Sequence, residues 1–235
     1  MRMRALLVLA AIGCGAQPEP AQPAPARSSG AEQLSWGPRG EGMKVEGILG
    51  TIPQLRIEEV LEAKLPEFQR CFFAGSGEIA SLGGHMKFYF HVALDGHVEW
   101  VSPRGSSIGH RPTEVCLLSR AANARFPKPK GGGPAEFVWG FELEPADSSH
   151  AHAISPERVM PAVEQHRSEL SVCGVNAAGH YVVTAYIAPG GRTEAVGAAA
   201  DSNEAAEHID CIVDAIRGWE LTDPGDTTAK VSFRL

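Results

Sequence analysis

Two stretches of alternating hydrophobic and polar residues, one in each half of the chain, predict the central strands of two sheets. The apolar positions of the first stretch are Met86, Phe88, Phe90, Val92 and Leu94, and those of the second are Tyr181, Val183, Ala185 and Ile187. A period of two is typical of a strand with one buried face. Each stretch runs into a glycine-containing turn, which predicts a hairpin. With a turn at Leu94-Asp95-Gly96, we expect Val92 to face Val98 and Phe90 to face Trp100.

Apolar residues at helical spacing predict a helix before and after each hairpin. The first pattern runs from Ile57 to Phe72 and contains Pro66, which favours a kink or two short helices. The second helix begins near Pro112, and its expected inward residues are Val115, Leu118 and Ala122, with Leu117 as a further candidate. In the second half we expect a helix from Ser155 to Cys173, broken near Pro161, and a stripe of Ile209, Ile212, Val213 and Ile216. Alternating runs predict closing strands at 135–143 and 230–235.

The two halves are copies of one pattern. A shift of 95 aligns Gly84-His85 with Gly179-His180, and the distance from the hairpin glycine to the next cysteine is the same in both (116 − 96 = 20; 211 − 191 = 20). Upstream, Cys71 corresponds to Cys173, and downstream Phe141-Glu142-Leu143 corresponds to Phe233-Arg234-Leu235. Such a repeat predicts an α+β protein with two tandem αββαβ domains. Each would be a three-stranded antiparallel sheet with two helices packed on it, at 43–145 and 154–235, joined by a linker at 146–153. A short strand is also expected at Lys44–Leu49.

The N-terminus predicts export. Basic Met1-Arg2-Met3-Arg4 precedes a short apolar run that ends in Ala11-Ile12-Gly13-Cys14, which resembles a bacterial lipobox. We therefore expect residues 1–14 to be a lipoprotein signal ending at Cys14, the lipidated residue. The alternative is an ordinary signal peptide cut nearby, which would leave a free cysteine. Residues 15–42 are rich in proline and polar residues, and we expect a disordered tether there.

Net charge and cysteine content narrow the class of protein. The formal charge is −7, and removing Arg2 and Arg4 with the signal makes it −9 (−7 − 2), which argues against nucleic-acid partners and against binding to anionic lipid heads. Of five cysteines, four remain after Cys14, and four allow three pairings. Because each repeat should be self-contained, we expect the disulfides Cys71–Cys116 and Cys173–Cys211. Buried free thiols are the alternative.

Few side chains indicate a catalytic or metal-binding site. His91, His97 and Glu99 share the polar side of the first predicted hairpin and are weak candidates for a zinc or copper site. The alternative is a solvated strand face, and the second repeat has Tyr186 and Arg192 at the histidine positions. There is no Cys-x-x-Cys or Gly-x-Ser-x-Gly pattern, and Gly131-Gly132-Gly133 reads as a turn. We expect no catalytic residues, no cofactor and no enzymatic activity.

The first repeat resembles the AgmX/PglI C-terminal domain family, which is similar in topology to the TonB C-terminal domain. The resemblance rests on Cys71-Phe72, Gly84, Gly96, Ser106-Ser107, Cys116 and Phe126-Pro127. The second repeat keeps Cys173, Gly179, Gly191, Cys211 and Trp219, but has Leu221-Thr222 in place of Phe126-Pro127. The family occurs in delta-proteobacterial envelope proteins, some tied to gliding motility. The resemblance implies a non-enzymatic interaction module and supplies no catalytic residues.

Together these patterns predict a lipid-anchored scaffold or protein-binding module on the periplasmic face of the envelope, at the outer membrane of a Gram-negative bacterium. Its partners would be envelope proteins or an extended peptide that pairs with an open sheet edge. The same edge could instead pair with the other repeat in one continuous sheet. The rival functions are a periplasmic small-ligand or metal-binding lipoprotein and a thiol oxidoreductase.

Overall fold

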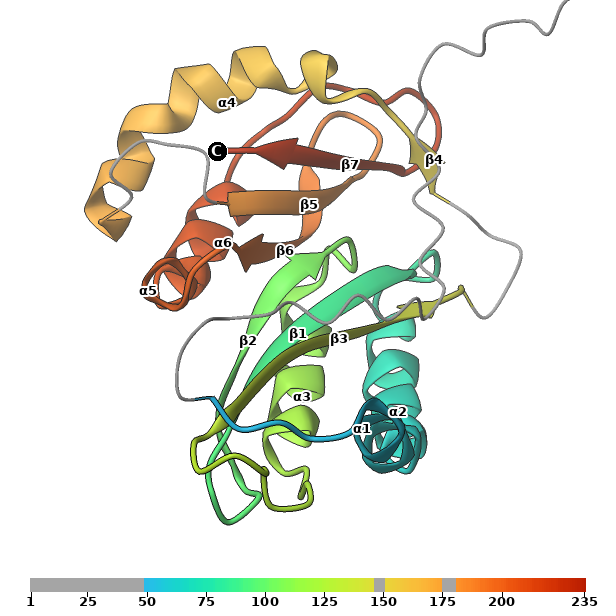
Figure 1. Cartoon of the computed structure of the whole chain (residues 1–235). Coiled ribbons are helices and arrows are strands. Elements are labelled where there is room, and N and C mark those ends of the chain that lie inside the picture. The colour runs from blue at the N-terminus through green and yellow to red at the C-terminus, as the bar shows by residue number, and fades with distance from the viewer. Residues whose placement is uncertain (1–48, 146–150, 175–180) are drawn as a thin grey trace, which may run out of the picture. The chain divides into compact units, whose positions relative to one another are not determined.

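The computed structural model describes residues 49–145, 151–174 and 181–235, all of which belong to the unit Trp36–Leu235 (Figure 1). The predicted signal, Cys14, the tether and all of the predicted strand Lys44–Leu49 except its last residue lie outside the described residues. Within the described residues, none of the helices has the length and apolar character needed to cross a membrane.

The first half of the described chain forms a three-stranded antiparallel sheet with helices on one side. Its elements are α1 (Gln54–Glu62), α2 (Leu65–Ser76), β1 (Gly84–Val92), β2 (Val98–Ser106), α3 (Arg111–Ala122) and β3 (Ala135–Leu143), and the strand order is β2-β1-β3. Figure 1 shows α2 and α3 on the same side of this sheet. Pro66 lies in the first turn of α2, where its missing N–H is not needed, so the prediction of two short helices is confirmed.

Aromatic rings fill the first core. The alternating residues of β1 point toward the helices, and Phe88 and Phe90 are fully buried. The ring of Phe68 from α2 stacks on Phe88, with centroids 5.8 Å apart, and on Phe141 of β3 at 5.1 Å. The predicted buried positions Met86, Phe88, Phe90 and Val92 are therefore confirmed, whereas Leu94 lies in the turn and is 56% exposed. The stacked rings join α2 and β3 to β1.

The second half forms a four-stranded mixed sheet. Its elements are β4 (His152–Ala153), the 3-10 helix η1 (Pro156–Arg158), α4 (Met160–His166), the 3-10 helix η2 (Arg167–Cys173), β5 (Tyr181–Ile187), β6 (Thr193–Ala200), α5 (Asn203–Ala206), α6 (Ile209–Arg217) and β7 (Ala229–Arg234). The strand order is β4-β7-β5-β6, with β4 parallel to β7. A three-stranded sheet was expected here, and residues 152–153 of the expected linker are the fourth strand instead. Two residues are too few to produce an alternating pattern.

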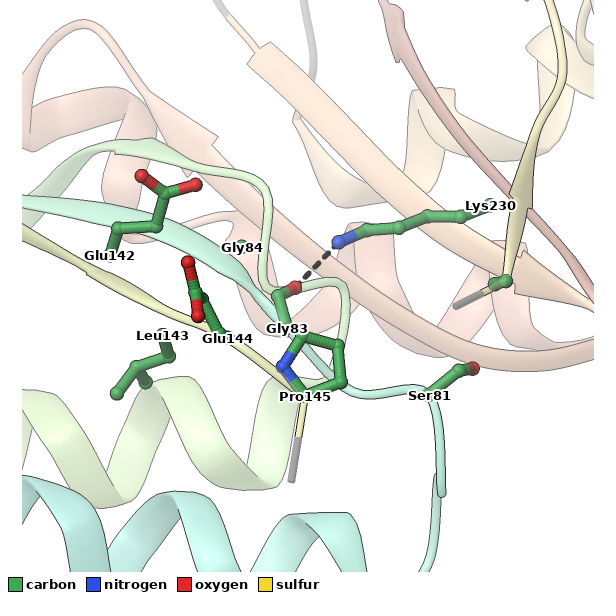
Figure 2. Close-up of a pocket in the computed structure, with 9 residues that line it drawn as sticks. Ser81, Gly83, Gly84, Glu142, Leu143, Glu144, Pro145 and Lys230 are labelled. Carbon is green, nitrogen blue, oxygen red and sulfur yellow. Dashed lines mark hydrogen bonds between the residues drawn. The ribbon is translucent and has the colours of Figure 1, made fainter. Parts of the chain in front are cut away.

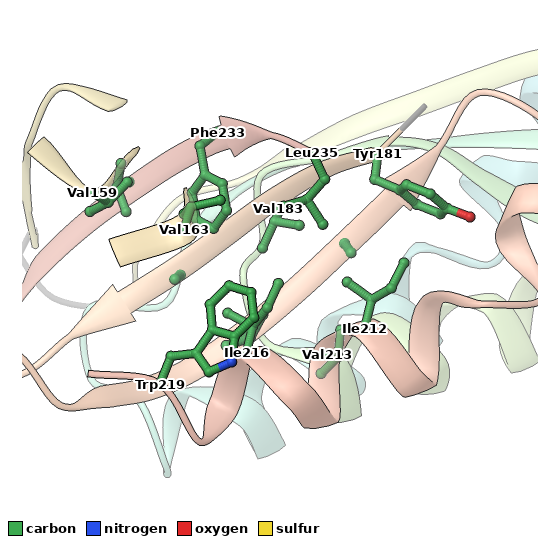
Figure 3. Packing of buried hydrophobic residues seen from close by; sticks show 14 of the residues in the cluster. Val159, Val163, Tyr181, Val183, Ile212, Val213, Ile216, Trp219, Phe233 and Leu235 are labelled. Carbon is green, nitrogen blue, oxygen red and sulfur yellow. The ribbon is translucent and has the colours of Figure 1, made fainter. Parts of the chain in front are cut away.

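The stripe predicted on the last helix packs the second core. Ile209, Ile212, Val213 and Ile216 are all buried on α6, and Figure 3 shows three of them facing Val183 and Trp219. Branched aliphatic side chains are more numerous here than in the first core, and the buried rings are those of Tyr181, Trp219 and Phe233. The predicted helix up to Cys173 is broken near Pro161, as expected, between η1 and α4, and it changes again after His166, where the 3-10 helix η2 begins.

Two details of the first half differ from expectation. A bulge next to Val92 places Trp100 opposite His91, so the expected Phe90–Trp100 pair is wrong and Val101 faces Phe90 instead. The expected inward face of α3 is also wrong in part, because Val115 is 46% exposed. The residues that α3 buries are Thr113, Glu114, Leu117 and Ala121.

The strand register also corrects the alignment of the repeats. His91 lies opposite Trp100 and Glu136, and Tyr186 lies opposite Ala195 and Lys230. His91 and Tyr186 differ by 95, as the repeat predicted, but Glu136 and Lys230 differ by 94 (230 − 136). The expected match of Phe141 with Phe233 used a shift of 92, so it is off by two residues.

Candidate interaction surface

Both disulfides of the described chain join the helical layers of their own half. Cys71 of α2 bonds Cys116 of α3, with Cα atoms 5.7 Å apart, and Cys173 at the end of η2 bonds Cys211 of α6 at 5.6 Å. These are the pairs that the repeat predicted. Two disulfides of this kind fit an exported protein in an oxidising environment. Each disulfide joins two helices of the same half, and neither involves a strand.

The outer face of the first sheet, opposite its helices, carries a cluster of aromatic and charged side chains. The ring of Trp100 stacks on His91, with centroids 5.0 Å apart, and tilts against Tyr89 at 5.3 Å. The guanidinium carbon of Arg104 lies 4.4 Å from the centre of the Tyr89 ring. The cluster is built by the bulge in β2, since the bulge turns Trp100 to this face.

Glu136 of β3 ties the edge strand to this cluster. Its carboxylate accepts a hydrogen bond from the Tyr89 hydroxyl at 2.5 Å and lies 2.9 Å from Nδ1 of His91. Burial alone would raise the pKa of Glu136, but the hydrogen bonds from Tyr89 and His91 outweigh it, and the pKa is lowered. Burial, with the Glu136 carboxylate as the next cause, raises the pKa of Tyr89 to about 12. Near neutral pH the pair is therefore a carboxylate and a neutral phenol.

The three residues considered for a metal site do not converge. His91 Nε2 lies 3.3 Å from Glu99, but His97 pairs with Asp95 inside the hairpin loop. Among residues 49–145, 151–174 and 181–235, no three histidine, cysteine or carboxylate side chains are placed to hold a metal ion together. The arrangement suits a packed polar face, in which His91 is held between two carboxylates.

β3 ends the first sheet with an open edge among the described residues, since its ladder partner is β1 alone. On the helix side of the strand, Phe137, Trp139 and Phe141 are only partly buried. On the outer side, Val138 is 45% exposed. The strand has neither lysine nor proline, the residues that commonly protect an edge from pairing. An extended chain could add to this edge and reach apolar side chains on one side.

The corresponding outer face in the second half is covered. Tyr186 is fully buried and belongs to the first core, and its hydroxyl lies 3.3 Å from the backbone nitrogen of Gly83 and 3.3 Å from the carbonyl of Ser81. Lys230 donates to the Gly83 carbonyl and lies 5.2 Å from the centre of the Tyr186 ring. The two sheets remain separate, so the continuous sheet left open by the sequence does not form in the described part.

Glu114 closes the edge of β6. The carboxylate accepts hydrogen bonds from the hydroxyl of Ser106, at 2.6 Å, and from the backbone nitrogen of Ala198, at 3.2 Å. A side chain on Gly197 would collide with it, since a Cβ there would lie 2.2 Å from Oε1. Burial raises the pKa of Glu114, although its hydrogen bonds oppose the rise. Glu114 therefore covers the β6 edge at Gly197 and Ala198, whereas no strand pairs with the edge of β3 among the described residues.

A pocket of about 370 Å³ lies where Lys230 reaches the loop before β1 (Figure 2). Its walls include Gly83, Glu142, Glu144 and Pro145. Burial lowers the pKa of Lys230 to about 8. The ammonium group is already hydrogen-bonded to Gly83, as the dashed line in Figure 2 shows, so its visible role is to hold the two halves together.

Sequence patterns missed the polar residues that matter most here. Glu114 occupies a helix start, where acidic residues are ordinary, and Lys230 sits at the beginning of a short strand. For Glu136 the sequence offered one indication. It lies at a polar position of the alternating run at 135–143, and the polar positions of that run were expected on the outer side of the sheet, as His91 was. Comparison with protein-family models, curated proteins and solved structures finds no match for this chain.

Proposed function

We propose that the chain is a lipid-anchored envelope protein that binds other proteins through the open edge of β3. In this proposal Cys14 carries the lipid and residues 15–42 give reach from the outer membrane on its periplasmic side. The two halves are tandem αββαβ repeats of the AgmX/PglI C-terminal type, and the protein acts as a scaffold without enzymatic activity.

The observation that carries the proposal is the difference between two of the four sheet edges, those of β6 and β3. On the β6 edge the backbone nitrogen of Ala198 is bonded to Glu114, while the β3 edge has no partner strand among the described residues. An unprotected edge offers backbone donors and acceptors in a row, which is how many modules bind an extended peptide. The Cys71–Cys116 disulfide would hold the helices behind the sheet as a rigid support.

Site-specific photo-crosslinking tests the binding edge. A benzoylphenylalanine placed at Val138, beside the edge, is expected to form an adduct with a partner in membranes of cells that make the protein. The matched control is Val172, which is 85% exposed in the second half. Amide hydrogen exchange on the purified complex should then slow within β3 and not within α6. Equal adducts at both sites, or unchanged exchange in β3, would refute the edge as the binding surface.

The anchor has its own test. Intact mass and peptide mapping of protein extracted from membranes should find a lipid on Cys14 and the pairs Cys71–Cys116 and Cys173–Cys211. An unmodified Cys14 would remove the anchor from the proposal, whatever the outcome at β3.

A further inference from the structure

We propose that the β3 edge selects an extended peptide in which basic and apolar residues alternate. This inference rests on the proposed function, since it names the partner chemistry of the same edge. It follows from the unlike chemistry of the two sides of β3.

The helix side of the edge is apolar. Phe137, Trp139 and Phe141 point to this side and remain partly accessible, as do Val60 of α1 and Leu65 of α2. A strand added to β3 would place every second side chain over this surface. Burying an apolar side chain there removes nonpolar surface from water on both partners, so these positions favour valine, isoleucine, leucine or an aromatic residue.

The outer side of the edge is acidic. Glu136, Glu142 and Glu144 share it, and residues 135–145 include no lysine or arginine. Glu142 and Glu144 are exposed, whereas Gly140 between Val138 and Glu142 has no side chain. Lys87 of β1 lies opposite Gly140, and a Cβ on that glycine would lie 3.1 Å from the Lys87 side chain. Arg104 lies on β2 over the Tyr89 ring. The charges that β3 itself contributes to this side are therefore all negative.

Because the two sides of β3 differ, the side chains of the partner strand should alternate between two kinds. In a sheet the side chains of neighbouring strands stay on the same face, so the outer residues of the added strand would lie beside Glu136 and Glu142. Opposite charges across strands are favourable and like charges are unfavourable, by about two- to fivefold in affinity for each pair. Lysine or arginine at these positions, and apolar residues between them, fit both sides at once.

Binding of designed peptides to the full chain tests the inference. The probe is a nine-residue peptide, the length of β3, that alternates lysine and valine. The comparison peptides alternate glutamate and valine, or carry the lysines and valines in two separate blocks. Isothermal titration should give the alternating lysine peptide at least a tenfold advantage over both. The advantage over the glutamate peptide should shrink at high salt.

Charge reversal on the protein supplies the matched control. Glu142→Lys should weaken the lysine–valine peptide about five- to tenfold and strengthen the glutamate–valine peptide. Glu207→Lys, an exposed position in the second half, makes the same change in net charge and should leave both affinities unchanged. An equal response to the two substitutions would mean that only net charge matters, which overturns the inference.

The results of these experiments distinguish a failure of the charge selection from a failure of the proposed binding function. If both alternating peptides bind equally and slow hydrogen exchange in β3, the charge selection is wrong and the edge still binds. If neither binds while Val138 crosslinks a partner in membranes, the peptide chemistry is wrong. Loss of the Val138 adduct and of all peptide binding would refute both.

Discussion

The two halves of the molecule place different chemistry at one equivalent position of their sheets. In the first half, His91, Trp100 and Glu136 form a polar and aromatic cluster that is only partly exposed, with 17% of the His91 side chain and 18% of the Glu136 side chain accessible. In the second, the equivalent residues are Tyr186, Ala195 and Lys230, and the first half covers them. Both halves form an antiparallel strand pair followed by a helix and a third strand. The side chains at the equivalent positions differ, so a similar order of elements does not produce a similar surface.

The largest expected effect on stability comes from removing the disulfide, a feature that both halves have. The disulfides span 45 and 38 residues, and on the chain-entropy estimate each stabilises the fold by about 4 kcal/mol. The double substitution Cys71→Ala with Cys116→Ala should therefore lower the free energy of unfolding as much as Cys173→Ala with Cys211→Ala. Chemical denaturation measures both. A loss confined to one pair would show that the two copies do not depend equally on their cross-links.

The next largest effect compares the outer faces of the two sheets at the equivalent positions Tyr186 and His91. Tyr186→Ala removes a fully buried ring and should cost about 3 kcal/mol, whereas His91→Ala removes a partly accessible ring and should cost about 1 kcal/mol. Thermal or chemical unfolding of the two variants gives the comparison. Equal losses would contradict the view that one face is interior and the other is surface.

The equivalent pair Glu136 and Lys230 predicts two pH windows. The pKa of Lys230 is lowered to about 8 from 10.5 by burial, so its positive charge disfavours the folded state below pH 8. Stability relative to Lys230→Met should rise by about 2 kcal/mol as the pH increases from 8 to 10.5. The lowered pKa of Glu136 acts in acid: its contribution is present above pH 4.5 and is lost as the pH falls through its folded-state pKa. Wild type minus Glu136→Gln should therefore decline only below pH 4.5.

Urea unfolding over both pH ranges checks the two windows. Each variant is the control for the other, because Lys230→Met should not alter the acid range and Glu136→Gln should not alter the alkaline range below pH 10, where Tyr89 is neutral in both states. A flat difference across pH 8 to 10.5 would contradict a buried, charged Lys230.

The smallest effect concerns the ion pair between the halves. Arg111 Nε lies 2.6 Å from Asp210, but the Asp210 side chain is 73% exposed. Because solvent screens exposed pairs, Asp210→Asn should cost about 0.5 kcal/mol or less in the free energy of unfolding. A larger loss would show that this pair, rather than Tyr186 and Lys230, holds the halves together.

Local patterns predicted most of the strands and helices because their causes are local. The alternation in β1 and β5 and the apolar stripe on α6 indicate which side of each element is buried. The matching positions of the cysteines in the two halves predicted the disulfides. The bulge beside Val92 left no such signal, since Val98 and Trp100 are both apolar and fit either register. A single extra residue then moved Trp100 to the other face.

The candidate surface was predictable only in part, because it depends on contacts between distant residues. The alternation of residues 135–143 predicted the apolar side of β3, and an open edge was expected in general. The contact that engages the β6 edge comes from Glu114, 84 residues away from Ala198 along the chain. A carboxylate at a helix start gives no sign of such a contact. For the same reason the buried face of α3 was misplaced, since α3 packs against β6 of the second half as well as against α2 and β2.

One corner of the first half also has a mechanical consequence. The backbone of Gly50 donates to the Pro134 carbonyl at 2.8 Å, and Thr51 and Lys130 exchange two backbone hydrogen bonds, at 2.7 and 2.9 Å, just before β3 begins. If the proposed tether pulls at Leu49 and the proposed partner pulls on β3, both apply tension to the same corner. These three bonds and the start of β3 then share the force with the covalent chain, which enters the first core at Ile52.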